Sequence, residues 1–307
     1  MANINNELEF VVENALKAPE ELIEKSEKRY RNIVENIADK INADTSKKIV
    51  MLAGPSGSGK TTTANKIREK LVSYGHKAYT VSLDDFYKNI GEGPKNEDGT
   101  YDFESVDSLD LELIHKCLQE LITSSYSELP LFDFMTGRRK KEKNAIRLEK
   151  DDVIIVEGLH ALNPAITDTL PHENLFKIYI SVSSRIYDGE KIVLNKRNIR
   201  FIRRMVRDFQ FRNSPVENTY SLWPKVTHGE DKYLFPFKSN ADITANTIHI
   251  YEPCVMKKQA LELLLTVEET SENYKDAQKL ISALEKFPAI EKDSVPKDSL
   301  LREFIGE

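Results

Sequence analysis

Apolar residues recur every three or four positions over residues 1–46, among many Glu and Lys. Two amphipathic helices are expected there. From Lys48 the pattern changes to a short apolar run at 49–53, a glycine-rich turn, an amphipathic stretch over 60–73 and a second apolar run at 78–83. This order predicts a strand, a helix and a second strand.

Two further apolar runs, at 153–156 and 178–182, alternate with helical patterns around 106–123 and 199–209. Short apolar runs that alternate with helices are typical of a mainly parallel sheet with helices on both faces. The expected fold class is therefore α/β, with three layers.

The C-terminal part again has helical spacing, at 255–267 and 274–284. We therefore expect a helical N-terminal extension over 1–46, an α/β domain over 47–268 and a helical C-terminal tail over 269–307. The tail is expected to pack on the α/β domain.

Composition narrows the class of protein. With 40% hydrophobic residues the chain can bury a sizeable core, and 44 Lys and Arg against 50 Asp and Glu give a net charge of −6. General nucleic-acid binding is not expected of such an acidic chain. No apolar run approaches the roughly 20 residues of a membrane span. The N-terminus lacks the build of a secretory signal, and Cys117 and Cys254 cannot form a disulfide framework, so we expect a cytoplasmic protein.

The turn after the first strand reads Gly-Pro-Ser-Gly-Ser-Gly-Lys-Thr over residues 54–61 and matches the P-loop pattern. Its glycines let successive backbone N–H groups point inward, and the next helix adds its positive N-terminal end. We expect Lys60 to reach the β- and γ-phosphates of ATP and the Thr61 hydroxyl to ligate Mg²⁺. A glycine-rich turn matching by chance is the alternative. The expected cofactor-binding residues are Gly54, Ser56, Gly57, Ser58, Gly59, Lys60, Thr61 and Thr62.

Acidic residues stand at the ends of two predicted strands. Asp84 and Asp85 follow the second strand, at the edge that faces the ligand crevice in an open α/β sheet. Asp84 can accept the proton of an attacking hydroxyl there, although capping of the next turn is equally compatible with its position. Glu157 ends the run that starts at Val153 and is a candidate metal ligand; the alternative is a solvated strand-end carboxylate.

Arginines form a stripe at Arg200, Arg203, Arg204 and Arg207, and Arg212 follows it. The spacing places the first four on one side of a helix. Like charge on one face is unfavourable unless anions meet it, and phosphoryl transfer supplies such anions. The alternative is a solvated face paired with surface Glu.

Three other features have weaker signals. The basic segment 138–143 lies in a loop-like region, and the sequence leaves open whether it faces solvent or substrate. Trp223 and His228 are interpreted as packing or surface residues. The six His show no metal-ligand spacing.

Taken together, five stretches resemble the uridine kinase and phosphoribulokinase family. They are the P-loop, Ser-Leu-Asp-Asp-Phe-Tyr at 82–87, Phe-Asp-Phe at 132–134, Val-Glu-Gly at 156–158 and Arg-Arg-Met-Val-Arg-Asp at 203–208. A bacterial branch of uridine kinase-like proteins is the most similar, through the segments 96–105, 136–139, 223–224 and 301–306. The resemblance implies a P-loop NTPase-type three-layer fold with a helical lid.

The resemblance also implies roles for single residues. Asp84 aligns with the catalytic base, and Glu157 with the acidic residue near Mg²⁺. Lys60, Arg204 and Arg207 are the other expected catalytic residues, and Arg212 is expected to contact the cofactor from the lid. The expected substrate contacts are Asp84, Tyr87, Phe132, Arg139 and Arg204. Related enzymes are often oligomeric, so a homo-oligomer is compatible with the resemblance, but the sequence identifies no contact surface.

One departure from the family pattern lies in the nucleoside pocket. Uridine and cytidine kinases usually have Tyr-Asp-Phe followed closely by a His that contacts the base. This sequence has Phe132-Asp133-Phe134 and then Gly137. The change removes hydrogen-bonding groups from a polar pocket, and such groups can carry much of an enzyme's discrimination.

The sequence therefore predicts an ATP- and Mg²⁺-dependent kinase. Its expected acceptor is the 5′-hydroxyl of uridine or cytidine. One alternative is the same phosphotransfer to a phosphorylated sugar, pantothenate or glycerate. The other is a weakly catalytic, nucleotide-responsive regulatory or RNA-binding module, for which the basic segment 138–143 and the N-terminal helices would serve.

Overall fold

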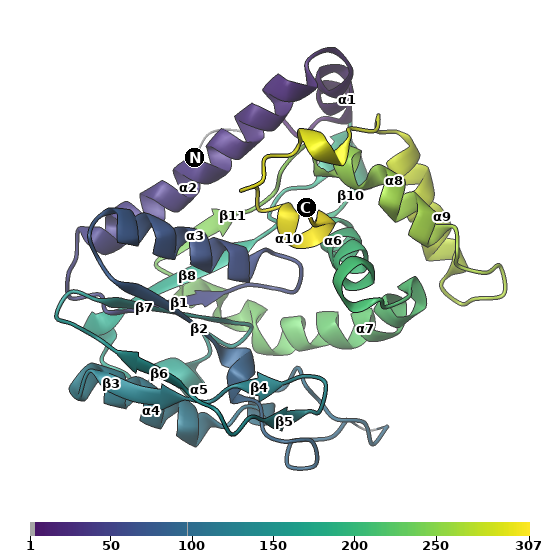
Figure 1. The fold of residues 1–307 in the computed structure, drawn as a ribbon. Coiled ribbons are helices and arrows are strands. Elements are labelled where there is room, and N and C mark those ends of the chain that lie inside the picture. Colours follow the sequence, from purple (N-terminus) through teal and green to yellow (C-terminus); the bar gives the residue numbers. More distant parts are fainter. Residues whose placement is uncertain (1–3, 97) are drawn as a thin grey trace.

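A five-stranded parallel sheet forms the centre of the computed structural model, which describes residues 4–96 and 98–307 (Figure 1). The strand order is β11-β8-β1-β7-β2, and every neighbouring pair is parallel. The strands are β1 (Ile49–Ala53), β2 (Ala78–Ser82), β7 (Val153–Gly158), β8 (Leu175–Ser181) and β11 (Ile243–Asn246). The mainly parallel sheet expected from the alternating pattern is confirmed.

Helices cover both faces of this sheet and extend beyond its carboxyl edge (Figure 1). They are α1 (Leu8–Lys17), α2 (Pro19–Asn42), α3 (Lys60–Ser73), α4 (Leu111–Thr123), α5 (Pro164–Thr167), α6 (Lys196–Arg212), α7 (Val216–Tyr233), α8 (Glu252–Leu264), α9 (Tyr274–Glu285) and α10 (Arg302–Ile305). Within the described residues there are also three small antiparallel pairs: β3 (Tyr126–Leu129) with β6 (Asn144–Arg147), β4 (Phe132–Asp133) with β5 (Arg138–Arg139), and β9 (Ile186–Asp188) with β10 (Lys191–Leu194).

The alternation of side chains along β1 divides the core into two apolar clusters. Val50 and Leu52 point to the cluster that contains α3 and α8, whereas Met51 points to the cluster under α4 and α5. Because β1 is buried on both faces, it has the continuous apolar run of a central parallel strand.

The N-terminal helices share the larger of the two clusters. In α2, Tyr30, Ile37 and Ile41 are buried together with Val50 of β1, and α2 lies along α3 (Figure 1). The domain division expected from the sequence stays a prediction, although α2 packs along α3 and shares an apolar core with the sheet.

Two local expectations need correction. The periodicity gave no helix over 216–233, where α7 forms with Pro224 in its interior. The segment 138–143, expected to be a loop, begins with strand β5, which pairs Arg139 with Phe132 and so closes a hairpin. In both places tertiary contacts outweigh a weak local signal.

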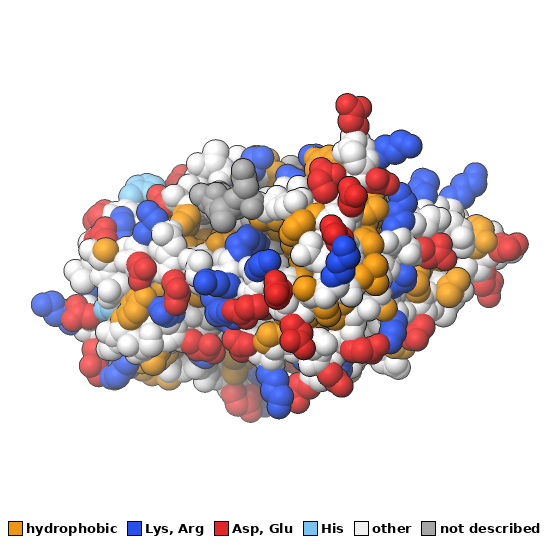
Figure 2. Space-filling model, turned by 90° about the horizontal axis from the view of Figure 1, so that it is seen from above, with side chains coloured by type: hydrophobic (Ala, Val, Ile, Leu, Met, Phe, Trp, Pro, Cys, Tyr) orange, Lys and Arg blue, Asp and Glu red, His pale blue; other side chains and the backbone are white. Residues whose placement is uncertain are grey.

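The surface carries both signs of charge. Figure 2 shows acidic and basic side chains interspersed across one face, with small apolar patches between them. None of the helices in the described part of the chain combines the length and apolar composition that a membrane span requires.

Candidate active site

The turn between β1 and α3 has a backbone that only glycine tolerates at key points. Gly57 and Gly59 have φ of 73° and 83°, in the left-handed region. A Cβ on Gly57 would lie 2.8 Å from the carbonyl oxygen of Arg200, so α6 packs directly on the turn. Gly59 is the N-cap of α3, which begins at Lys60. The first-turn N–H groups of α3 therefore stand at the carboxyl edge of the sheet, as phosphate binding requires.

Strand order explains why the acidic residues lie close to this turn. Strand β7 is inserted between β1 and β2, and Glu157 near its end is in register with Leu52 of β1 and Ser82 of β2. Asp84 follows β2 in a short 3-10 helix, Leu83–Phe86. Because carboxyl ends of parallel strands meet at one edge, three separate stretches of sequence deliver the turn and both carboxylates to one place.

A cavity of about 580 Å³ contains these groups. Lys60, Asp84 and Glu157, which the sequence predicts as separate site residues, all line it. The predicted site residues that line the cavity are Ser56, Gly57, Gly59, Lys60, Thr61, Asp84, Tyr87, Glu157, Arg204, Arg207 and Arg212. Its dimensions and lining suit a polar, phosphorylated ligand.

The other predicted site residues lie outside this lining. Gly54 and Ser58 belong to the turn's backbone, and Thr62 donates a hydrogen bond to Glu303 at 2.5 Å. Phe132 is buried behind Tyr87, with ring centroids 5.7 Å apart. Arg139 forms an ion pair with Asp110 at 3.0 Å and donates to two backbone carbonyls. In this structure Arg139 therefore holds the β4–β5 hairpin against its neighbours and does not line the cavity.

Desolvation raises the pKa values of several carboxyl groups in this cavity. Burial raises the pKa of Glu157 to about 7, partly offset by Lys60. Burial likewise raises the pKa of Glu104, another lining residue, to about 7. The Asp84 side chain is exposed to the cavity. Desolvation by the surrounding protein nevertheless raises its pKa as well, against the attraction of the Lys60 charge. A cation bound at Glu157 would offset the desolvation cost of that carboxylate and restore its ionisation.

The fit of a magnesium ion rests on two side chains. Thr61 Oγ1 donates to Glu157 Oε1 at 3.2 Å, so one cation could be shared by both oxygens. Over residues 4–96 and 98–307, no cluster of three or more His, Cys, Asp or Glu is arranged to hold a metal ion. The residues present therefore fit Mg²⁺ that keeps waters and phosphate oxygens as its remaining ligands.

The arginine stripe of α6 divides into two functions, which corrects the expectation that all its members face anions. Arg204 and Arg207 line the cavity and pair with Asp208, at 3.2 and 2.8 Å. Arg200 and Arg203, by contrast, are 2% and 0% exposed. Because α6 packs against neighbouring elements on more than one side, part of the arginine stripe is buried in the protein interior.

The two buried arginines support the phosphate-binding turn from beneath. Arg200 forms a bidentate ion pair with Glu230 of α7 and donates to the Ser56 carbonyl at 2.9 Å. Arg203 pairs with Glu252 and donates to the Gly57 carbonyl at 3.1 Å. Buried charges are stable when paired and hydrogen-bonded in this way.

Sequence reasoning missed several residues that line the cavity. Glu230 lies in none of the motif segments, whereas Glu104 and Glu303 belong to segments 96–105 and 301–306, which carry the resemblance but were given no role in the site. Phe103 and Phe134 also line it, 46% and 65% exposed. Phe134 belongs to the Phe-Asp-Phe motif at 132–134, but only the β4–β5 hairpin shows that its ring lies at the cavity.

A larger cavity, of about 850 Å³, contains none of the predicted site residues. Its charged lining is wholly basic, with Arg185, Lys196, Arg197, Arg200 and Lys238. This cavity has neither a carboxylate that could act as a base nor the lysine of the P-loop. Phosphotransfer is therefore assigned to the smaller cavity.

A P-loop after the central parallel strand, with carboxylates at the ends of the adjacent strands, defines a nucleotide-dependent phosphotransferase. The sequence model of the phosphoribulokinase/uridine kinase family matches residues 49–250. The chain belongs to this family, whose kinases use ATP to phosphorylate hydroxyl acceptors.

Individual relatives agree with this assignment. A uridine kinase of Borrelia hermsii is 31% identical over 198 residues, which cover 64% of this chain and 84% of the relative. A uridine kinase of Bacillus pumilus is 29% identical over 197 residues, with the same coverage. A crystal structure from Silicibacter sp. TM1040, of a protein proposed to be a fructose transport system kinase, matches with a TM-score of 0.51 at 16% identity. That match covers 69% of this chain and 98% of the other and supports the fold alone.

Proposed function

We propose that this protein transfers the γ-phosphoryl group of ATP to the 5′-hydroxyl of a pyrimidine nucleoside. The observation that carries the proposal is the convergence of Lys60, Asp84 and Glu157 on one cavity. The uridine kinase relatives support the choice of acceptor.

Each of these groups has a step that its position allows. Asp84 orients the acceptor hydroxyl and takes its proton as the oxygen attacks the γ-phosphorus. The bond from the γ-phosphorus to the bridging oxygen breaks, and ADP leaves. Lys60, Arg204 and Arg207 stabilise the charge that spreads over the phosphoryl oxygens. Thr61 and Glu157 would hold Mg²⁺, which neutralises phosphate charge when bound.

Aromatic side chains give the acceptor end of the cavity its character. Tyr87 and Phe103 lie edge to face with centroids 5.9 Å apart, and the Tyr87 hydroxyl donates to the Phe103 carbonyl at 3.0 Å. Phe134 stands 6.4 Å from Tyr87 and closes the same wall. A planar base can stack on such a wall. The wall therefore favours a nucleoside over a small polyol.

A departure in the sequence, and not the wall itself, keeps a second candidate acceptor open. Phe132 replaces the Tyr and Gly137 follows where the family usually has a base-reading His, so the base loses two hydrogen-bonding partners. A phosphorylated sugar, pantothenate or glycerate would not need those partners. Discrimination between uridine and cytidine should therefore be weak. An enzyme rejects a wrong base mainly when that base leaves polar groups of the site without hydrogen-bond partners.

An acceptor panel tests the proposal. ADP release is measured with Mg²⁺–ATP and each of uridine, cytidine, purine nucleosides, phosphorylated sugars, pantothenate and glycerate. Turnover with uridine or cytidine well above the acceptor-free background is expected. Turnover confined to a non-nucleoside acceptor would replace the nucleoside proposal. ATP binding without turnover on any acceptor would favour a weakly catalytic regulatory module.

A further inference from the structure

The C-terminal segment, residues 299–306, lies on the phosphate-binding turn. The Leu300 side chain occupies the space beside Gly59, where a Cβ would lie 2.6 Å from Leu300 Cδ1. The Phe304 ring stands 5.1 Å from the Arg203 guanidinium. These residues are fully buried, so the segment is part of the packed interior around the turn and not a loose tail.

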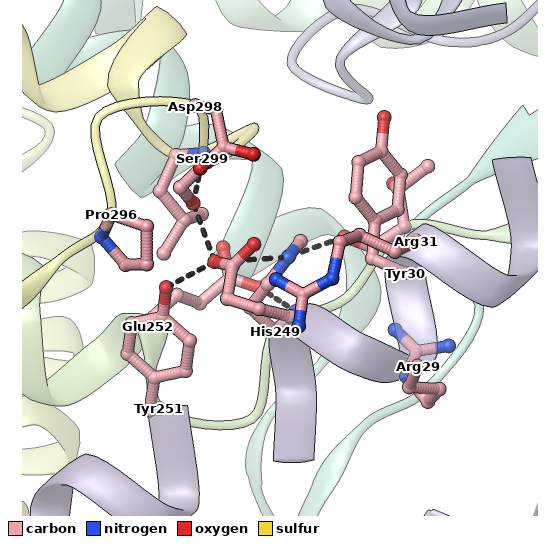
Figure 3. A network of polar contacts seen from close by, with 12 residues as sticks. Arg29, Tyr30, Arg31, His249, Tyr251, Glu252, Pro296, Asp298 and Ser299 are labelled. Carbon is pink, nitrogen blue, oxygen red and sulfur yellow. Dashed lines mark hydrogen bonds and ion pairs between the residues drawn. The ribbon is translucent and has the colours of Figure 1, made fainter. Parts of the chain in front are cut away.

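A buried polar network holds this segment in place (Figure 3). The Glu27 carboxylate of α2 accepts hydrogen bonds from Ser299 Oγ at 2.6 Å and from Tyr251 Oη at 2.5 Å. His249 Nε2 lies 3.5 Å from the same carboxylate. Burial opposes ionisation of Glu27, but the neighbouring His249, and after it the hydrogen bonds from Ser299 and Tyr251, lower its pKa to about 2. The C-terminal segment is thus tied to a stably ionised, buried carboxylate.

Glu303 is the residue that this arrangement delivers to the cavity. It lines the cavity together with Lys60 and Thr61, and its Oε2 accepts from Thr62 Oγ1 at 2.5 Å. Thr62 lies in the first turn of α3, next to the proposed magnesium ligand. A carboxylate at the positive N-terminal end of a helix is itself stabilising.

We infer that the C-terminal segment is a wall of the nucleotide site and that Glu303 is a positioning residue for it. The inference rests on the proposed function, because it deepens the same site. Through Thr62, Glu303 fixes the first turn of α3, and with it the direction of the phosphate-binding N–H groups and of the Thr61 hydroxyl. Preorganised donors bind phosphate more tightly than donors that must be ordered on binding.

The test is a double-mutant cycle on the Glu303–Thr62 pair, with Mg²⁺–ADP binding measured by calorimetry on the full chain. Glu303→Ala and Thr62→Val should each weaken binding roughly fivefold to tenfold, and the double variant should lose no more than either single one. Glu303→Gln keeps an acceptor oxygen and should recover most of the affinity. In turnover, KM for ATP should rise more than kcat falls. Glu307→Ala, at an exposed position in the same tail, is the matched control.

Affinity within twofold of the wild type for Glu303→Ala, or additive losses in the double variant, would overturn the inference. If Glu303→Ala does not fold, Glu303→Gln and Thr62→Val decide, since both keep the size of the side chain. A wild-type protein that fails to bind Mg²⁺–ADP would instead remove the proposed function. Normal binding in the wild type with an unchanged Glu303→Ala removes only this inference.

Discussion

At the scale of single residues, burial gives the site its chemistry. Glu157 sits among apolar strands, and the pKa of its carboxyl is raised from 4.5 to about 7. It therefore holds its proton over a pH range in which a solvated glutamate has lost it. The free energy of unfolding should therefore fall as pH rises from about 4.5 to 7, because Glu157 loses its proton more readily in the unfolded chain than in the folded protein.

This pKa predicts the pH dependence of metal binding. A cation that binds Glu157 must displace its proton, so Mg²⁺–ADP affinity should increase as pH rises from 6 towards 8, with proton release near pH 7. Calorimetry in buffers of different ionisation enthalpy measures that release. Glu157→Gln should abolish the Mg²⁺-linked part. Glu104→Gln is the control, because Glu104 titrates in the same range without a hydrogen bond to Thr61; equal loss in both variants would contradict the assignment.

At the scale of elements, α6 and α7 clamp the phosphate-binding turn. Glu230 Oε1 accepts from the Ser56 N–H at 2.9 Å while pairing with Arg200, which itself donates to the Ser56 carbonyl. One buried ion pair thus holds both backbone polar groups of a single turn residue. The turn is kept in shape by helices that follow it by more than a hundred residues.

Breaking this clamp should be costly. Glu230→Ala leaves the Arg200 charge buried without a partner, so we expect the free energy of unfolding to fall by about 3–5 kcal/mol. Asp231→Ala is the matched control, because its partner Arg197 is exposed and the pair should contribute less than about 1 kcal/mol. Urea unfolding of both variants gives the comparison. Equal losses would mean that the Arg200–Glu230 pair is no more than a surface contact.

Sequence patterns predicted the elements unevenly, for physical reasons. Strand β1 and helix α3 have the residue bounds that the pattern gave, because a fully apolar run followed by glycines and an amphipathic stretch has few alternatives. The sequence pattern did not predict helix α7, because Pro224 lies in its interior and because apolar and polar residues are mixed on its surface, which weakens the helical periodicity. The stripe of α6 was seen, but periodicity cannot tell an arginine that faces a phosphate from one that is buried against Glu230.

At the scale of the whole molecule, the fold gathers distant segments around one cavity. The order β1-β7-β2 explains how Lys60, Asp84 and Glu157 meet, and that much could be inferred from strand ends alone. The contribution of Glu303 could not, because it depends on where a segment more than two hundred residues away comes to rest. Contacts of that kind leave no local pattern.

The most direct test of the account is a comparison of binding and turnover in Asp84→Asn. The substitution keeps the shape of the side chain but removes the base, so Mg²⁺–ADP should bind within a few-fold of the wild type. Turnover with the best acceptor of the panel should fall by about a hundredfold or more. Undiminished turnover would contradict the central claim that Asp84 activates the acceptor beside Lys60 and Glu157.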